Sequence, residues 1–205
     1  MSKFVFDIET GPAPDSELAL VKPKFKGPSN YKDPTKIAEA IASAEADWKE
    51  KAALSAVTGR VLCIGILAGT TFEFLHGDET KLLGAFWEAW RDQGRVWVGW
   101  SCKSFDFPFL IRRSWALKVP VPADVFQGRY FDTRLVDLMD IWNCGNREQR
   151  ESLDTVCKML GLGAKNGSGA DFARLWIEDN DAAMDYLRND LRLTAALADR
   201  IGILQ

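Results

Sequence analysis

Phe4-Val5-Phe6-Asp7-Ile8-Glu9-Thr10 is the stretch that decides most about the fold of this chain. Apolar residues and acids alternate in it, which is typical of a β-strand with one buried face. The alternation places the phenylalanines and Ile8 on one face and Asp7 and Glu9 side by side on the other. Two such carboxylates repel each other, and burying them at the end of an apolar strand is costly unless a cation neutralises them. The pair is a candidate ligand set for Mg²⁺ or Mn²⁺, with a polar strand end that turns into solvent as the alternative.

Strand and helix patterns alternate along the rest of the chain, which predicts an α/β domain. Strands are expected at Lys3–Ile8, Arg60–Ala68, Thr71–Leu75 and Arg95–Trp100. The two-residue link Gly69-Thr70 predicts an antiparallel hairpin, and therefore a mixed sheet. Helices are expected at Lys36–Leu54, Glu79–Gln93, Ser104–Trp115, Thr133–Trp142, Ser152–Leu160 and Asp181–Ile201. We interpret two apolar stripes at helical spacing as core, namely Ile37, Ile41, Ala44 and Trp48 in the first helix and Leu187, Leu191, Thr194 and Ala198 in the last.

Two segments do not fit this alternation of strand and helix patterns. Residues 11–30 contain several prolines and glycines together with Lys22, Lys24 and Lys26, and they are predicted to form an irregular loop. Residues 161–169 are rich in glycine, but no strand precedes them and their spacing is not GxGxxG, so we expect a flexible connection between helices. Without repeats or low-complexity tracts, residues 1–205 are interpreted as one domain, with an insertion at 11–59 that holds a lysine-rich loop and a helix.

The amino-acid composition limits the classes of function that the chain can have. The 205 residues are 47% hydrophobic and 27% charged, as in ordinary globular domains. The net charge of −3 excludes an overall cationic field, so any nucleic acid must be bound through local patches or metals. The scattered Cys63, Cys102, Cys144 and Cys157 match no zinc or disulfide spacing and are expected to be reduced and buried. No apolar run is long enough to cross a membrane and no secretion segment is visible, so we expect a cytoplasmic protein without membrane contact.

Another acid follows the fourth predicted strand, in Trp100-Ser101-Cys102-Lys103-Ser104-Phe105-Asp106-Phe107-Pro108. Ser104 is the expected N-cap of the next helix, which places Asp106 in the first helical turn. Such an acid is favoured by the helix dipole alone, so a structural role is the alternative to a catalytic one.

A tyrosine and an acid share one face of the last predicted helix. Tyr186 and Asp190 are four residues apart and can therefore point at the same site. Among the three tyrosines only Tyr186 has an acid at this spacing. An ordinary surface pair on an acidic helix is the alternative.

These three elements, in this order, resemble the motifs of the DEDD superfamily of 3′ to 5′ exonucleases. More narrowly, the chain looks like the tyrosine subgroup, which includes the proofreading domains of family B DNA polymerases. Asp7 and Glu9 match the first motif, Phe105 and Asp106 the second, and Tyr186 and Asp190 the third. Ser152-Leu153-Asp154-Thr155-Val156 is also similar to the connecting region of those domains. The resemblance implies a ribonuclease H-like fold, with a mixed five-stranded sheet flanked by helices, and a free-standing exonuclease.

The resemblance also implies a mechanism with two Mg²⁺ or Mn²⁺ ions about 4 Å apart. Asp7 would bridge the ions, with Glu9 and Asp190 completing one site and Asp106 supporting the other. Tyr186 would orient the attacking water, since a phenol with a reference pKa near 10 is a poor base at neutral pH. His76, the single histidine, lies outside the motifs and is interpreted as structural.

The substrate-binding residues expected from the motifs and their surroundings are Thr10, Ser101, Phe105, Phe107, Lys22, Lys24 and Lys26. Ser101 departs from the family pattern, because proofreading domains usually carry asparagine at that position. The expected partner is single-stranded nucleic acid, DNA in preference to RNA. An exoribonuclease with the same site and a binding module without catalysis are the alternatives.

Overall fold

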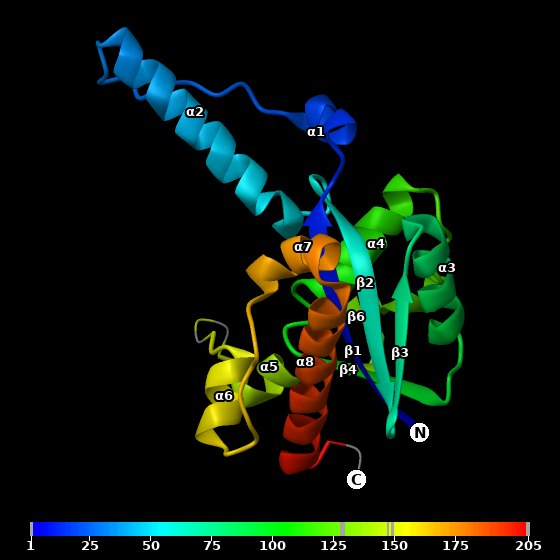
Figure 1. Ribbon diagram of the computed structural model, residues 1–205. Helices are drawn as coiled ribbons and strands as arrows, with labels where there is room; N and C mark the ends of the chain where they lie inside the picture. Colours follow the sequence, from blue (N-terminus) through cyan, green and yellow to red (C-terminus); the bar gives the residue numbers. More distant parts are fainter. Residues whose placement is uncertain (1, 128–129, 147, 149, 204–205) are drawn as a thin grey trace.

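The computed structural model describes residues 2–127, 130–146, 148 and 150–203, and at its centre is a five-stranded sheet in the order β3-β2-β1-β4-β7 (Figure 1). The strands are β1 (Ser2–Pro12), β2 (Gly59–Ala68), β3 (Thr71–His76), β4 (Arg95–Gly99) and β7 (Leu135–Asp137). β2 runs antiparallel to β1 and β3, whereas β4 runs parallel to β1 and β7. The predicted α/β class, the Gly69-Thr70 hairpin and the mixed sheet are confirmed.

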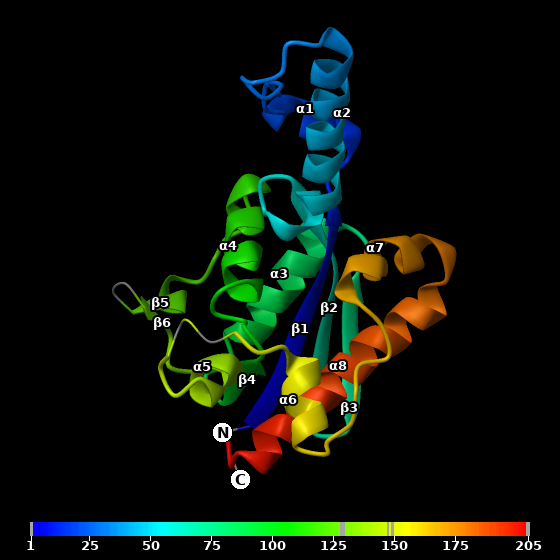
Figure 2. The ribbon, with the colours of Figure 1, turned by 90° about the vertical axis from the view of Figure 1, so that its left-hand side faces the viewer.

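Helices cover both faces of this sheet (Figure 2). On one side lie α3 (Glu79–Trp90) and α4 (Asp106–Ala116), and on the other α6 (Leu153–Met159), α7 (Gly169–Glu178) and α8 (Asn180–Arg200). Each face has its own apolar core because strand residues alternate between the two. Phe6 and Ile8 belong to the core beneath α3 and α4, and Val5 belongs to the core beneath α8. Asp7 and Glu9 share the face of Val5, so the alternation directs both acids toward α8.

β1 is longer than the strand beside it. Its parallel pairing with β4 extends only from Ser2 to Val5, whereas its antiparallel pairing with β2 continues to Pro12. The second half of β1 therefore has one edge without a neighbouring strand in its sheet. Asp7 and Glu9 lie on this half, just beyond the carboxyl end of β4, where open α/β sheets commonly bind ligands.

The predicted helix Thr133–Trp142 is wrong in its first half. Leu135–Asp137 forms β7 at the edge of the sheet, and only Leu138–Trp142 is helical, as α5. The Asp137 carboxylate accepts the backbone N–H of Met139 at 2.9 Å, which starts this helix. Three short elements lie before β7 in the chain. They are the 3-10 helix η2 (Ala123–Val125) and the two strands of a small hairpin, β5 (Phe126–Gln127) and β6 (Tyr130–Phe131).

The insertion between β1 and β2 forms an arm that projects from the rest of the fold (Figure 1). It consists of α1 (Asp15–Val21), an extended segment, α2 (Pro34–Glu50) and the short 3-10 helix η1 (Lys51–Leu54). The expected loop at 11–30 thus contains the end of β1 and a helix. The predicted core stripe is also wrong, since α2, which is described in full, buries none of its residues. Trp48 instead packs against Phe25 and a small cluster at the base of the arm.

The four cysteines are free, but they are not all buried. Cys63, Cys102 and Cys157 lie in the interior, whereas Cys144 is exposed after α5, so its predicted burial is wrong. Among the helices in the described part of the chain, none combines the length and hydrophobicity needed to cross a bilayer.

Candidate active site

Four carboxylates from three distant segments of the chain meet in one pocket. Oxygen atoms of Asp7, Glu9 and Asp190 all lie within 4.8 Å of one another, and Asp106 lines the same pocket. β1 supplies the first two, the start of α4 supplies Asp106, and α8 supplies Asp190. The pocket holds about 270 Å³.

Asp106 is fixed by the unpaired edge of β1. Its Oδ1 accepts the backbone N–H of Ile8 at 3.2 Å, at a point on β1 that β4 does not reach. Asp106 is the first residue of α4, and Phe105 stands at the N-cap without a side-chain cap bond. Ser104 was expected to cap this helix, but its hydroxyl contacts Ser101 instead, so that prediction is wrong. The helix start and β1 together hold the Asp106 side chain beside Asp7.

Tyr186 and Asp190 point from one face of α8 into the same pocket, as the spacing predicts. Tyr186 is 3% exposed and Asp190 is 2% exposed, so neither is an ordinary surface residue. Lys165, on the connection before α7, also reaches the pocket. Its Nζ lies 2.6 Å from Asp190 Oδ2 and donates to the Tyr186 hydroxyl oxygen at 2.9 Å.

Burial and mutual repulsion oppose ionisation of these acids. Burial raises the pKa of Asp7 and of Glu9 well above their usual values, and neighbouring carboxylates raise both further. Burial raises the pKa of Asp106 to about 6, and it also raises that of Asp190. Lys165 is the cation that lowers the pKa of Asp7 and Glu9. One ammonium group therefore faces four acids.

The donor set fits divalent metal ions. Carboxylate oxygens are the ligands that Mg²⁺ and Mn²⁺ prefer, and three of them are already close enough to share an ion. Asp190 Oδ1 is buried and has no hydrogen-bond partner among the described residues. A buried acceptor without a partner is costly, and a cation would satisfy it.

Some of the expected substrate residues lie in the pocket. Thr10, Ser101 and Phe105 line it. The Thr10 hydroxyl donates to the carbonyl of Ala53 at 2.7 Å and so ties β1 to the base of the arm. The Ser101 backbone adopts a φ of 59°, in the left-handed region, at the turn after β4.

Other expected substrate residues lie elsewhere. Phe107 is 0% exposed and packs against Trp87 and Trp90 in the core, so it offers no surface to a ligand. Lys22, Lys24 and Lys26 are exposed along the arm and are not among the residues that line the pocket. Lys22 pairs with Glu45 of α2 at 2.5 Å. His76, interpreted as structural, packs edge-on against Trp176.

Lys165, Leu54 and Trp100 also line the pocket and were not singled out from the sequence. Lys165 lies in a glycine-rich connection without periodicity, and Leu54 lies at the end of the insertion, so neither position had a pattern to identify it. Leu54 is 65% exposed, so its apolar side chain is accessible at the edge of the pocket.

We expect Lys165→Met to lower the unfolding free energy of the metal-free protein by about 2 kcal/mol. Removing one partner of a buried ion pair leaves the other uncompensated, and we expect less than the full cost because the lysine side chain is 27% exposed. Mn²⁺ should narrow the difference, since it neutralises the acids in both proteins. Denaturant unfolding in chelator and in Mn²⁺ measures both effects. Lys158→Met, at a surface pair with Asp154, is the control, and equal losses in the two variants would contradict the role of Lys165.

The fold resembles part of a solved polymerase. The match is to the family B DNA polymerase from the hyperthermophilic archaeon Pyrobaculum calidifontis, with a TM-score of 0.67 and 18% sequence identity. It covers 98% of this chain and 24% of the polymerase chain. At this identity the match supports the fold, and the predicted ribonuclease H-like architecture is confirmed. A comparison with curated proteins found no match.

The sheet order, its two helix layers and this structural match define the class, an α/β domain with a ribonuclease H-like fold. Residues 68–197 match the family described as "Predicted 3'-5' exonuclease related to the exonuclease domain of PolB". Because the match spans more than half of the 205 residues, the chain belongs to this family. The matched range contains Asp106, Tyr186 and Asp190 and begins after Asp7 and Glu9. The predicted relationship to polymerase exonuclease domains is confirmed, while the tyrosine subgroup stays a prediction.

Proposed function

We propose that this protein is a metal-dependent 3′-5′ exonuclease. Residues 1–205 would act as one exonuclease domain that removes nucleoside 5′-monophosphates from the 3′ end of single-stranded DNA. Asp7, Glu9, Asp106 and Asp190 would hold two Mg²⁺ or Mn²⁺ ions. The observation that carries the proposal is the convergence of these four buried or half-buried acids in one pocket, with a carboxylate oxygen of Asp190 that lacks a partner among the described residues.

The chemistry divides between the metal ions and the protein. When bound, a pair of divalent ions lowers the pKa of a water molecule and stabilises charge on the leaving oxygen. Tyr186 has a different task. Burial and the nearby acids raise the pKa of its phenol, so the group stays protonated at neutral pH. Lysine is only a donor, so the tyrosine oxygen accepts from Lys165 and its own O–H remains a donor, to Asp190 in this structure and to the attacking water in the proposed reaction.

The pocket walls suit the end of a strand. Trp100, Phe105 and the exposed Leu54 present apolar surface around the acids, and bases stack on such surfaces without regard to sequence. Membership of a family related to polymerase exonuclease domains favours DNA as the substrate. We therefore expect the enzyme to digest a DNA strand faster than an RNA strand of the same sequence in Mg²⁺. Faster digestion of RNA would replace DNA by RNA in the proposal and keep the same site.

The lysines of the arm provide a separate prediction about affinity. Lys22, Lys24 and Lys26 lie on the extended segment, and the base of the arm reaches the pocket through Leu54. We propose that these lysines contact phosphates of the bound strand. Replacing all three by alanine should weaken binding to single strands and flatten the slope of log affinity against log salt, by about 0.7 for each lost contact. The rate at saturating substrate should change little.

A matched control for the arm replaces Lys81, Lys118 and Lys158, which are exposed and do not line the pocket. Fluorescence anisotropy across a salt series measures both triple variants. Lys22 already pairs with Glu45, so Lys24 and Lys26 should account for most of the change. If the arm variant and the control give the same slope as the wild type, the arm does not bind the strand.

A further inference from the structure

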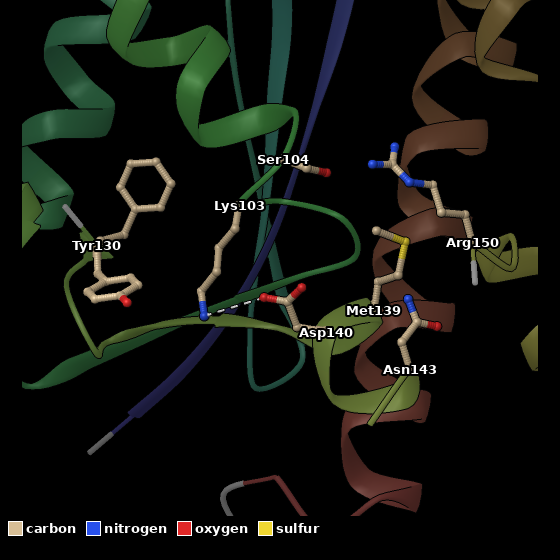
Figure 3. Close-up of a pocket in the computed structure, with 8 residues that line it drawn as sticks. Lys103, Ser104, Tyr130, Met139, Asp140, Asn143 and Arg150 are labelled. Carbon is tan, nitrogen blue, oxygen red and sulfur yellow. Dashed lines mark ion pairs between the residues drawn. The ribbon is translucent and has the colours of Figure 1, made fainter. Parts of the chain in front are cut away.

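A second cavity adjoins the acidic pocket across one short loop. It holds about 390 Å³ and is formed by the loop after β4, the β5–β6 hairpin, α5 and the segment before α6 (Figure 3). Among the side chains that line it are Lys103, Ser104, Tyr130, Met139, Asp140 and Arg150. None of these six belongs to the four-carboxylate site, and none was singled out from the sequence as a binding residue.

The two cavities share a wall. Ser101 and Phe105 line the acidic pocket, while Lys103 and Ser104, between them in the chain, line the second cavity. The loop of residues 101–105 therefore has one side toward each cavity. A ligand held at the acids and extending past this loop would enter the second cavity.

The wall is held rigidly by a buried acid. Asp137 is 2% exposed and accepts three backbone N–H groups: Ser101 at 2.9 Å, Lys103 at 2.9 Å and Met139 at 2.9 Å. Two of these donors belong to the shared loop and the third begins α5, which forms the floor of the second cavity. Three hydrogen bonds to one carboxylate fix the loop against α5, so the positions of the two cavities relative to each other are fixed as well.

The charge of the second cavity is opposite to that of the first. Lys103 and Arg150 supply two cations against the single acid Asp140, whose carboxylate lies 3.9 Å from the lysine Nζ. Arg150 has no ion-pair or hydrogen-bond partner among the described residues. In the view of Figure 3, its guanidinium points toward the side on which the Ser104 hydroxyl lies. A guanidinium and a hydroxyl that line the same cavity are suited to binding a phosphate group.

The cavity also offers surface for a base. The Tyr130 side chain is 60% exposed, and Met139 lies on the opposite side in Figure 3. Cations interleaved with an exposed aromatic ring are the usual composition of a single-strand binding surface. A nucleotide unit carries both groups that this composition recognises, a phosphate and a planar base.

We propose that the second cavity binds the nucleotides that precede the 3′-terminal one, with Arg150 and Lys103 on a phosphate and Tyr130 against a base. This inference rests on the proposed function, because it takes the terminal nucleotide to lie at the four acids. It explains how a protein with a net charge of −3 and a strongly acidic active site retains a polyanion. The strand is held where the surface is cationic and cut where the carboxylates lie.

Two substitutions in the cavity have opposite expected effects. Arg150→Ala should lower kcat/KM for a ten-nucleotide DNA strand by roughly 10-fold, mainly through KM, as one charge-assisted hydrogen bond is lost. Asp140→Asn should raise it by roughly threefold, because a repelling charge is removed and Lys103 is released from its pair. Neither should alter hydrolysis of the p-nitrophenyl ester of thymidine 5′-monophosphate, which is long enough to fill only the acidic pocket. Arg200→Ala is the charge-matched control, since Arg200 lies about 15 Å along α8 from Asp190.

The two substrates distinguish failure of this inference from failure of the proposed function. Equal losses by Arg150→Ala on the strand and on the small ester, or no loss on either, would overturn the second site while leaving the exonuclease in place. If the wild type hydrolyses neither substrate, the proposed function fails. Binding of the ten-nucleotide strand in chelator, measured by anisotropy, then tests whether the second cavity binds the strand, independently of hydrolysis. Weaker binding by Arg150→Ala and tighter binding by Asp140→Asn would support it, and unchanged binding would overturn it.

Discussion

Asp7→Ala and Asp190→Ala are each expected to abolish exonuclease activity, with a loss of roughly 10⁴-fold or more, the scale seen when one member of a catalytic group that acts as a unit is removed. Their carboxylate oxygens, with that of Glu9, lie within 4.8 Å of one another, so each would supply a ligand to the proposed metal ions. Both variants should fold. Burial and the neighbouring acids raise the pKa of Asp7, so ionising it in the metal-free protein is unfavourable and its removal should not weaken the fold.

The control for these variants is Asp185→Ala. Asp185 is on the same helix as Asp190, but it lies at the surface and pairs with Arg188. Its removal should leave activity unchanged. The thermal unfolding temperature of each variant, with and without Mn²⁺, shows whether a loss of activity follows loss of the metal or loss of the fold. Near wild-type hydrolysis by either purified site variant would remove that acid from the proposed site.

Tyr186→Phe is expected to slow hydrolysis by roughly 10- to 1000-fold without abolishing it. The substitution keeps the ring that packs against Phe172 and removes only the hydroxyl that accepts from Lys165. Since the raised pKa of this phenol makes it a donor and not a base, its loss should misplace the water molecule while leaving its activation intact. Single-turnover rates at saturating Mg²⁺ measure the effect.

Tyr31→Phe, on the arm, is the control for this change, because Tyr31 is 42% exposed and does not line the pocket. A loss for Tyr186→Phe as complete as that for Asp7→Ala would mean that the phenol does more than orient water. An unchanged rate would mean that Tyr186 has no part in the reaction and serves only to pack the pocket wall.

The central strand is predictable from the sequence because successive side chains of a strand point to opposite faces of the sheet, and each face has its own requirement for apolar or polar residues. Alternation alone assigns Phe6 and Ile8 to one core and places Asp7 and Glu9 on the opposite face. The i, i+4 spacing of Tyr186 and Asp190 is equally local. These residues meet in the structure because each pattern determines where its own side chains point.

Features that depend on distant partners were not predictable in this way. The apolar stripe of α2, from Ile37 to Trp48, has the same spacing as a core helix, but the arm leaves it only half-buried because just Phe25 and a small cluster pack against its base. Leu135–Asp137 has the pattern of a helix, and only its pairing with β4 makes it a strand, since a three-residue edge strand carries too short a pattern of its own. In both cases the outcome depends on tertiary contacts: α2 lacks a packing partner among the described residues along most of its length, and Leu135–Asp137 has a strand beside it.

The position of Lys165 in the site also depends on a distant partner and was not predictable from the sequence. Nothing in a glycine-rich connection marks one lysine as the partner of an acid 25 residues later, yet its Nζ lies 2.6 Å from Asp190. The Asp137 carboxylate, which holds the loop beside the acids, falls in the middle of a helix by sequence pattern. Both contacts span segments that no local periodicity connects.

In the proposed reaction these acids bind divalent metal ions, which hydrolyse a strand from its 3′ end. The most direct measurement is a time course on one single-stranded DNA labelled in separate samples at its 5′ end and at its 3′ end, with Mg²⁺, Mn²⁺ or chelator. We expect the 3′ label to be released first as a nucleoside 5′-monophosphate, the 5′-labelled strand to shorten in single-nucleotide steps, and chelator to stop both. Early release of the 5′ label, internal cleavage, or hydrolysis that persists in chelator would contradict the proposed mechanism.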